Sequence, residues 1–208
     1  MAHEHGGGNG RLCQTLGSPM NLTKYFGNGL RMVSTPLNQP TEHTSMGLFA
    51  YSMPLLFGKL KLRGSTSFFA WLLVQSKILT ADKLMARNWP CNPVCALCDQ
   101  EPETANHLIL HCSFAREVWH RVSSWSGELL LQPSIGMSLE DWWNDSLAGL
   151  SKEDRKSKVT ILIYSAWNIW KARNRQVFYH TLLTPPQVLL EIKKEIALRK
   201  RARGEESS

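Results

Sequence analysis

The sequence predicts a mainly α-helical protein, and three observations support this fold class. After residue 66, apolar residues recur at spacings of three and four, as they do on one face of a helix. Residues that favour helix starts stand directly before these patterns, namely Thr80, Ser138, Ser151 and Thr184. Four of the five cysteines in this chain of 208 residues lie between residues 91 and 112. The odd total of five argues against a disulfide framework, and clustered cysteines in a reducing compartment are typical of metal ligands.

Residues 1–65 differ from the rest of the chain, and we expect them to form a flexible, low-order N-terminal arm. They hold most of the glycines, no tryptophan and no sustained apolar pattern. Turn-forming residues interrupt them throughout. The exception is Leu48–Leu62, which is apolar enough to form a short strand or to dock on the rest of the protein.

Residues 66–126 are expected to form a small helical domain. Its first part, Phe68–Leu79, is crowded with large apolar side chains and predicts a mostly buried helix. Thr80 is the predicted N-cap of a second short helix that ends near Asn88. A third helix is expected over Glu103–Leu110, and a fourth follows the last cysteine. The fourth helix has one apolar face, made by Phe114, Val118, Val122 and Trp125.

Residues 127–208 are expected to form a helical C-terminal extension. Serine followed three residues later by aspartate, a pattern of helix starts, occurs at Ser138 and Ser151. The second of these opens a long helix through about Phe178, with a buried side made by Val159, Leu162, Ile163, Ala166, Ile169 and Trp170. Thr184 precedes a last helix that ends in a basic run. Its apolar stripe consists of Val188, Leu189, Ile192 and Ile196.

One pattern carries specific chemical information, Cys95-x2-Cys98-x8-His107-x4-Cys112. Zinc binds four ligands in a tetrahedron, and soft thiolates with a neutral imidazole suit it well. A gap of two residues lets a tight turn direct the first two sulfurs to one ion, and the polar turn Asp99–Pro102 can fold the chain back. Four protein ligands leave no open position for water, so the predicted site is structural. The predicted domain is therefore a helical unit clamped by one structural zinc knuckle.

The same residues leave alternatives to this ligand set. His111 lies four residues after His107 on the same helical face and could replace Cys112 as the fourth ligand. Cys91 could be a ligand but is better explained as a buried or spare thiol. All of these residues could also be reduced core cysteines with a surface histidine. Because His107 and Cys112 are five residues apart, they can share an ion only if the helix between them ends near His111.

Two runs of the sequence resemble the zinc-binding domain that follows the reverse transcriptase in polyproteins of plant LINE-type (non-LTR) retrotransposons: FFAWLLVQSKILTADKLMARNWPCNPVCALC and ETANHLILHCSFAREVW. A later segment, AWNIWKARNRQVF, is similar to the tail that follows this domain. The resemblance covers about residues 67–180 and leaves out the first 65 residues. It implies zinc as the cofactor and Cys95, Cys98, His107 and Cys112 as its ligands. It also implies a scaffold role for Ala115, Val118 and Trp119.

We do not expect the chain to be an enzyme or to have a small-molecule substrate. A reverse transcriptase needs paired aspartates, and no two aspartates are adjacent here. A nuclease needs several carboxylates around a metal pair, whereas these acids fit helix caps. The sequence has no Gly-rich phosphate loop, HExxH or GxSxG motif. No His-x-Glu precedes Cys95, as a zinc deaminase would require. The expected identity is a detached, non-catalytic part of such an element.

The basic composition favours an acidic partner. Lys and Arg total 24 against 17 acidic residues, a formal net charge of +7, although the cysteine-rich part itself carries no net charge. We expect RNA or single-stranded DNA as the partner, bound by Lys171, Arg173, Arg175, Arg199, Lys200, Arg201 and Arg203. The alternatives are a solvated helix face for these cations, a protein partner bound by the last helix, and an inert retroelement remnant without activity.

The sequence also predicts where the protein resides. It contains no run of about 20 apolar residues that could cross a membrane. Its first residues lack the charged and then apolar layout of a secretory signal. We expect an intracellular protein, and the basic C-terminal run together with the family resemblance favours the nucleus.

Overall fold

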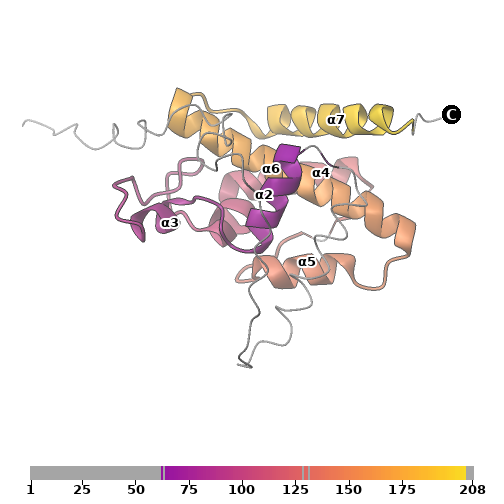
Figure 1. The fold of residues 1–208 in the computed structure, drawn as a ribbon, viewed down its shortest axis with the longest axis horizontal. Coiled ribbons are helices and arrows are strands. Elements are labelled where there is room, and N and C mark those ends of the chain that lie inside the picture. Colours follow the sequence, from indigo (N-terminus) through magenta and orange to yellow (C-terminus); the bar gives the residue numbers. More distant parts are fainter. Residues whose placement is uncertain (1–61, 63, 128, 131, 205–208) are drawn as a thin grey trace, which may run out of the picture.

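The computed structural model describes residue 62 and residues 64–127, 129–130 and 132–204. These residues form a mainly helical structure without a β-strand in the described ranges, which confirms the predicted fold class (Figure 1). Almost all of the predicted N-terminal arm lies outside the described residues, including the stretch Leu48–Leu62 apart from its last residue. Leu62 is partly buried against the hydrophobic core.

The longest helix, α6 (Lys152–Tyr179), is the centre of the packing. α2 (Gly64–Val74), α4 (Ser113–Trp125) and α7 (Pro185–Ala202) each pack against it, and α7 also packs against α4 (Figure 1). Because α6 has neighbours on several sides, its buried residues are not confined to one narrow stripe. They include the predicted residues Val159, Leu162, Ile163, Ala166 and Ile169, while Trp170 is partly exposed.

The helix starts follow the predicted capping residues. α5 (Leu139–Leu147) begins after Ser138, whose Oγ accepts a hydrogen bond from the Asp141 N–H at 3.1 Å. α6 begins after Ser151, whose Oγ accepts one from the Asp154 N–H at 3.2 Å. Each side chain satisfies a backbone donor that has no partner inside its helix. The predicted stripe of α7 is also confirmed, since Val188, Ile192 and Ile196 are buried and Leu189 is half-buried.

The predicted apolar face of α4 is correct for three of its four residues. Phe114, Val118 and Val122 are buried, whereas Trp125 keeps 38% of its surface exposed. Trp125 is the last residue of α4, so no further helical turn covers its ring. Lys193 of α7 lies over this ring instead, with its Nζ 5.3 Å from the ring centroid.

Two short helical segments lie between α2 and α4, and both differ from the sequence prediction. α3 (Ala81–Met85) starts after Thr80 as predicted but ends before Asn88. Asn88 takes a φ of 55°, in the left-handed region, which an α-helix cannot continue. The predicted helix over Glu103–Leu110 is replaced by a helical turn at residues 105–106 that continues into the π-helix η3 (His107–His111).

Candidate metal centre

Cys95 and Cys98 lie in a tight hairpin between α3 and η3. The Cys95 N–H donates a hydrogen bond to the Glu101 carbonyl at 2.8 Å. An isolated antiparallel bridge joins Val94 to Pro102. The chain therefore folds back within residues 95–101. The turn starts before the predicted stretch Asp99–Pro102, whose last residue is already paired with Val94.

The turn of this hairpin directs backbone donors to the sulfur of Cys95. The Asp99 N–H donates to the Cys95 carbonyl at 2.9 Å, and Asp99 adopts a left-handed φ of 53° that closes the turn. The N–H groups of Leu97 and Cys98 hydrogen-bond to the Cys95 sulfur and favour its thiolate form. The turn is thus built to hold a negatively charged sulfur.

The π-helical turn η3 brings His107 and Cys112 to the same side of the chain. The Cys112 N–H donates to the His107 carbonyl at 2.7 Å, a bond across five residues where an α-helix would make one across four. In a π-helical turn, residues five positions apart are about one turn apart, so the side chains of His107 and Cys112 lie on the same side of the chain. The helix also ends after His111, as predicted, and Cys112 becomes the N-cap of α4. An α-helical turn would leave the two side chains on different faces.

The four predicted ligands converge, and their ligand atoms all lie within 4.8 Å of one another. The sulfurs of Cys95 and Cys112 are 3.9 Å apart, and the Cys98 sulfur is 3.3 Å from His107 Nε2. A tetrahedron with zinc–sulfur bonds of about 2.3 Å has edges of about 3.8 Å, so the spacing fits such a site. Cys95 and Cys112 are fully buried and Cys98 is half-buried. This cluster could hold a metal ion.

The second ring nitrogen of His107 also has a polar neighbour. Nδ1 lies 3.2 Å from Glu101 Oε2, but the two atoms are not aligned for a hydrogen bond. The His107 N–H donates to Thr104 Oγ1 at 3.1 Å and fixes the backbone. A carboxylate beside the free nitrogen is the usual environment of a metal-binding histidine, because it holds the ring with Nε2 available for the metal.

Close packing shifts the pKa values of these groups. A hydrogen bond with Cys112 is the main cause that lowers the pKa of Cys95 to about 3. The same bond, together with burial, raises the pKa of Cys112. A hydrogen bond to Cys95 is the main cause that raises the pKa of His107 to about 9. Without a metal ion, the Cys95 and Cys112 sulfurs therefore share a proton, and the raised pKa of His107 favours its protonated form. Because metal ligands must be deprotonated, metal binding releases these protons and weakens as the pH falls.

The structure does not bring the two alternative ligands to the cluster. His111 Nε2 lies 2.9 Å from the Met137 carbonyl, within hydrogen-bond distance. The Cys91 thiol donates to the Ala81 carbonyl at 3.6 Å. Neither residue is part of the group of four.

The two histidines therefore give a direct test of the ligand set. His107→Ala is expected to lower metal affinity by at least about 100-fold, because it removes a ligand. His111→Ala should leave the affinity within about threefold, since it loses only a hydrogen bond to a backbone carbonyl. Competition with a chromogenic chelator measures both values. Similar losses for the two variants would contradict the assignment.

The scaffold residues implied by the family resemblance are buried in α4, the helix that begins after Cys112. Ala115 and Val118 are fully buried in α4. Trp119 is 1% exposed, and its Nε1 donates to the Ile109 carbonyl of η3 at 2.6 Å. Its ring also meets that of Trp142 edge to face, with centroids 4.8 Å apart. Trp119 thus supplies a donor to the backbone of the π-helical turn.

Arg173, one of the predicted nucleic-acid-binding residues, does not face the solvent. Its guanidinium donates to Glu103 Oε1 at 2.6 Å and to Oε2 at 3.0 Å, and the residues are 5% and 2% exposed. Glu103 Oε1 also accepts from the Ala81 N–H at 3.0 Å, at the start of α3. The pair therefore connects the metal-site hairpin, α3 and α6. The sequence contains a signal for its burial, because Leu162, Ala166 and Arg173 fall at spacings of one and two helical turns.

The other predicted cations lie on α6 and at the end of α7. Lys171 keeps 20% of its side chain exposed, and its Nζ forms an ion pair with Glu195 Oε1 at 2.7 Å. Arg175 is exposed. In the basic run, Lys200 and Arg201 are exposed, and Arg199 and Arg203 are partly exposed.

Comparison with known proteins supports a zinc-binding domain in this part of the chain. Residues 53–119 match the family described as zinc-binding in reverse transcriptase, a match that contains all four cluster residues and covers less than half of the chain. No curated protein and no solved structure matches the chain. Within the described ranges, none of the helices combines the length and apolar character needed to span a membrane.

Proposed function

We propose that the chain is a non-catalytic zinc-binding module derived from the polyprotein of a plant LINE-type retrotransposon, and that it associates with RNA or single-stranded DNA. The convergence of Cys95, Cys98, His107 and Cys112 carries the proposal. Three sulfurs and one imidazole form a donor set that zinc prefers. Four protein ligands complete its coordination, which leaves no position for a substrate and gives the ion a structural role.

The proposed role of zinc is to hold the hairpin, η3 and the start of α4 together at one point. The hairpin supplies Cys95 and Cys98, whereas η3 supplies His107 and the start of α4 supplies Cys112. Binding of an ion by all four would fix the hairpin against α4 and therefore against the helical core. In small zinc modules this binding contributes about 10 kcal/mol or more to folding.

We place the nucleic-acid contact at the α7 basic cluster, defined as Arg199, Lys200, Arg201 and Arg203. Glu195 of α7 bonds to Asn168 and Lys171 of α6, and Figure 1 shows that the two helices run in roughly opposite directions. Arg175 then lies roughly 15–20 Å along the helix axes from this cluster, at 1.5 Å per residue. Arg173 takes no part because it is buried. The cluster is thus the densest group of exposed or partly exposed cations among those predicted.

Binding to a fluorescently labelled oligouridine tests this surface by anisotropy at several salt concentrations. Replacing all four cluster residues by glutamine is expected to weaken binding at low salt at least about tenfold. The slope of log K against log salt should fall by up to about 0.7 for each lost phosphate contact.

A matched variant shows whether the position of the four charges matters for binding or only the net charge of the protein. Gln replacement of Arg116, Arg121, Lys152 and Lys156 removes the same charge from other surfaces and should weaken binding far less. Equal losses in the two variants, or no binding of the wild type at low salt, would contradict the proposed surface. The cations would then serve only to stabilise the C-terminal end of α7.

A protein-interaction module is the second candidate function, and one observation favours it. Leu190 and Leu198 of α7 keep 52% and 46% of their surfaces exposed. If they form an association surface, a pull-down from nuclease-treated extract should recover a partner with the wild-type chain. The same partner should be lost when both leucines are replaced by lysine.

A further inference from the structure

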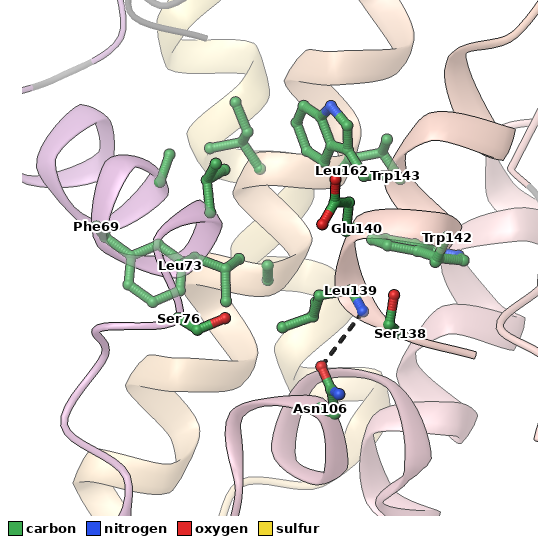
Figure 2. A pocket seen from close by; sticks show the side chains of 14 residues that line it. Phe69, Leu73, Ser76, Asn106, Ser138, Leu139, Glu140, Trp142, Trp143 and Leu162 are labelled. Carbon is green, nitrogen blue, oxygen red and sulfur yellow. Dashed lines mark hydrogen bonds between the residues drawn. The ribbon is translucent and has the colours of Figure 1, made fainter. Parts of the chain in front are cut away.

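A cavity of about 220 Å³ lies between α2, α5 and α6. Its wall is mostly apolar and aromatic. Phe69 and Leu73 come from α2, Trp142 and Trp143 from α5, and Leu162 from α6 (Figure 2). The cavity is separate from the four cysteine and histidine residues of the metal centre, none of which lines it.

One charged side chain enters this apolar wall. Glu140, in the first turn of α5, is the only charged residue among those that line the cavity. Its Oε1 atom is buried and has no hydrogen-bond partner among the described residues. Figure 2 shows its carboxylate on the side of Leu162 and Trp143. A buried acceptor without a donor destabilises a folded protein, so a group that donates to Oε1 would be bound favourably.

Hydrogen bonds hold the backbone on both sides of Glu140. The Leu139 N–H donates to Asn106 Oδ1 at 3.3 Å, the bond drawn in Figure 2. The Asp141 N–H donates to Ser138 Oγ at 3.1 Å. Asn106 and Ser138 also line the cavity. The start of α5 is therefore fixed, and with it the position from which the carboxylate reaches the cavity.

We propose that this cavity binds a small organic cation that consists of a primary ammonium group on an apolar body. The ammonium group donates to Glu140 Oε1, and the body packs against the apolar wall. Trp142 and Trp143 form part of this wall. The cavity is smaller than the roughly 300 Å³ at which pockets for drug-sized ligands begin, which limits the body to a few carbon atoms. The site needs neither the metal ion nor nucleic acid, so it goes beyond the proposed function.

Binding of n-hexylamine, with n-hexanol as a neutral probe of similar length, tests this site. Both are titrated at pH 7 into the full zinc-loaded chain, by calorimetry and by saturation-transfer NMR. The wild type should bind n-hexylamine at least about tenfold more tightly than n-hexanol, because a hydrogen bond to a charged group adds affinity of that order. Glu140→Gln should weaken n-hexylamine binding about tenfold and leave n-hexanol binding unchanged.

Two further variants control this result. Glu117→Gln changes an exposed carboxylate of α4 that pairs with Arg121 at the surface, and it should leave both affinities unchanged. Ala70→Leu adds volume to the cavity wall and should abolish binding of both probes while the helical circular dichroism is retained. If Glu140→Gln does not fold, the wild-type comparison and Ala70→Leu decide the question. Equal affinity of the two probes for the wild type, or no binding at millimolar concentration, would overturn the proposal.

Discussion

Cys98→Ser is expected to remove metal binding and to lower the stability of the chain by at least about 4 kcal/mol. The expected loss is large because zinc binding contributes about 10 kcal/mol in small modules, while whole domains are stable by only about 5–15 kcal/mol. A loss of this size lowers the melting temperature by about 10 °C or more. Differential scanning calorimetry in the presence of zinc measures it. The helices α6 and α7 pack against each other through buried apolar residues outside the metal site. Part of the helical circular dichroism should therefore survive in this variant.

Cys91→Ser is the matched control for this variant. It makes the same chemical change seven residues earlier, at a thiol that donates to the Ala81 carbonyl outside the cluster. It should keep the metal and lose less than about 1 kcal/mol, the size of one weak hydrogen bond. If Cys98→Ser were as stable and as metal-bound as Cys91→Ser, the role of the cluster would be contradicted.

Arg173→Met is expected to destabilise the protein by about 3–5 kcal/mol, even though Arg173 is not a metal ligand. The substitution leaves the carboxylate of Glu103 buried at 2% exposure with its main charged partner removed. Glu103 also accepts from the Ala81 N–H, so the start of α3 should loosen as well. Urea denaturation of the metal-loaded chain measures the loss.

A double-mutant cycle with Glu103→Gln measures the interaction energy of this ion pair separately from other effects of the substitutions on stability. Because the neutral amide needs no buried counter-charge, the two substitutions together should cost clearly less than the sum of the single losses. Arg175→Met, two residues away on the exposed surface, should change stability by less than about 0.5 kcal/mol. Additive losses for Glu103 and Arg173 would mean that the pair does not act as a unit.

The sequence predicts those features that depend on near neighbours. The N-caps Ser138 and Ser151 are correct because the residue that each one caps lies three positions away. The spacing of the cysteines and histidines narrows the candidate ligands to a few side chains, and the family resemblance selects the four that converge in the structure. The prediction of the apolar stripe of α7 is also correct, because a helix with one buried face repeats its apolar residues every three or four positions.

Features that depend on distant contacts could not be derived in this way. The ion pair of Arg173 with Glu103 joins residues 70 positions apart, so the helical spacing that indicates burial of Arg173 does not identify its partner. The π-helical turn of η3 is stabilised in part by Trp119, which donates to the Ile109 carbonyl from the next helix. The cavity beside Glu140 depends on how three helices pack, and no local pattern encodes it.

The metal content of the full chain tests the central claim most directly. The protein is purified without added zinc, desalted, and analysed by mass spectrometry for all transition metals, with its fold checked by circular dichroism. The arrangement of Cys95, Cys98, His107 and Cys112 predicts about one zinc ion per chain, which a strong chelator removes together with part of the helical signal. A folded, helical chain that contains no metal and does not take up zinc would contradict it.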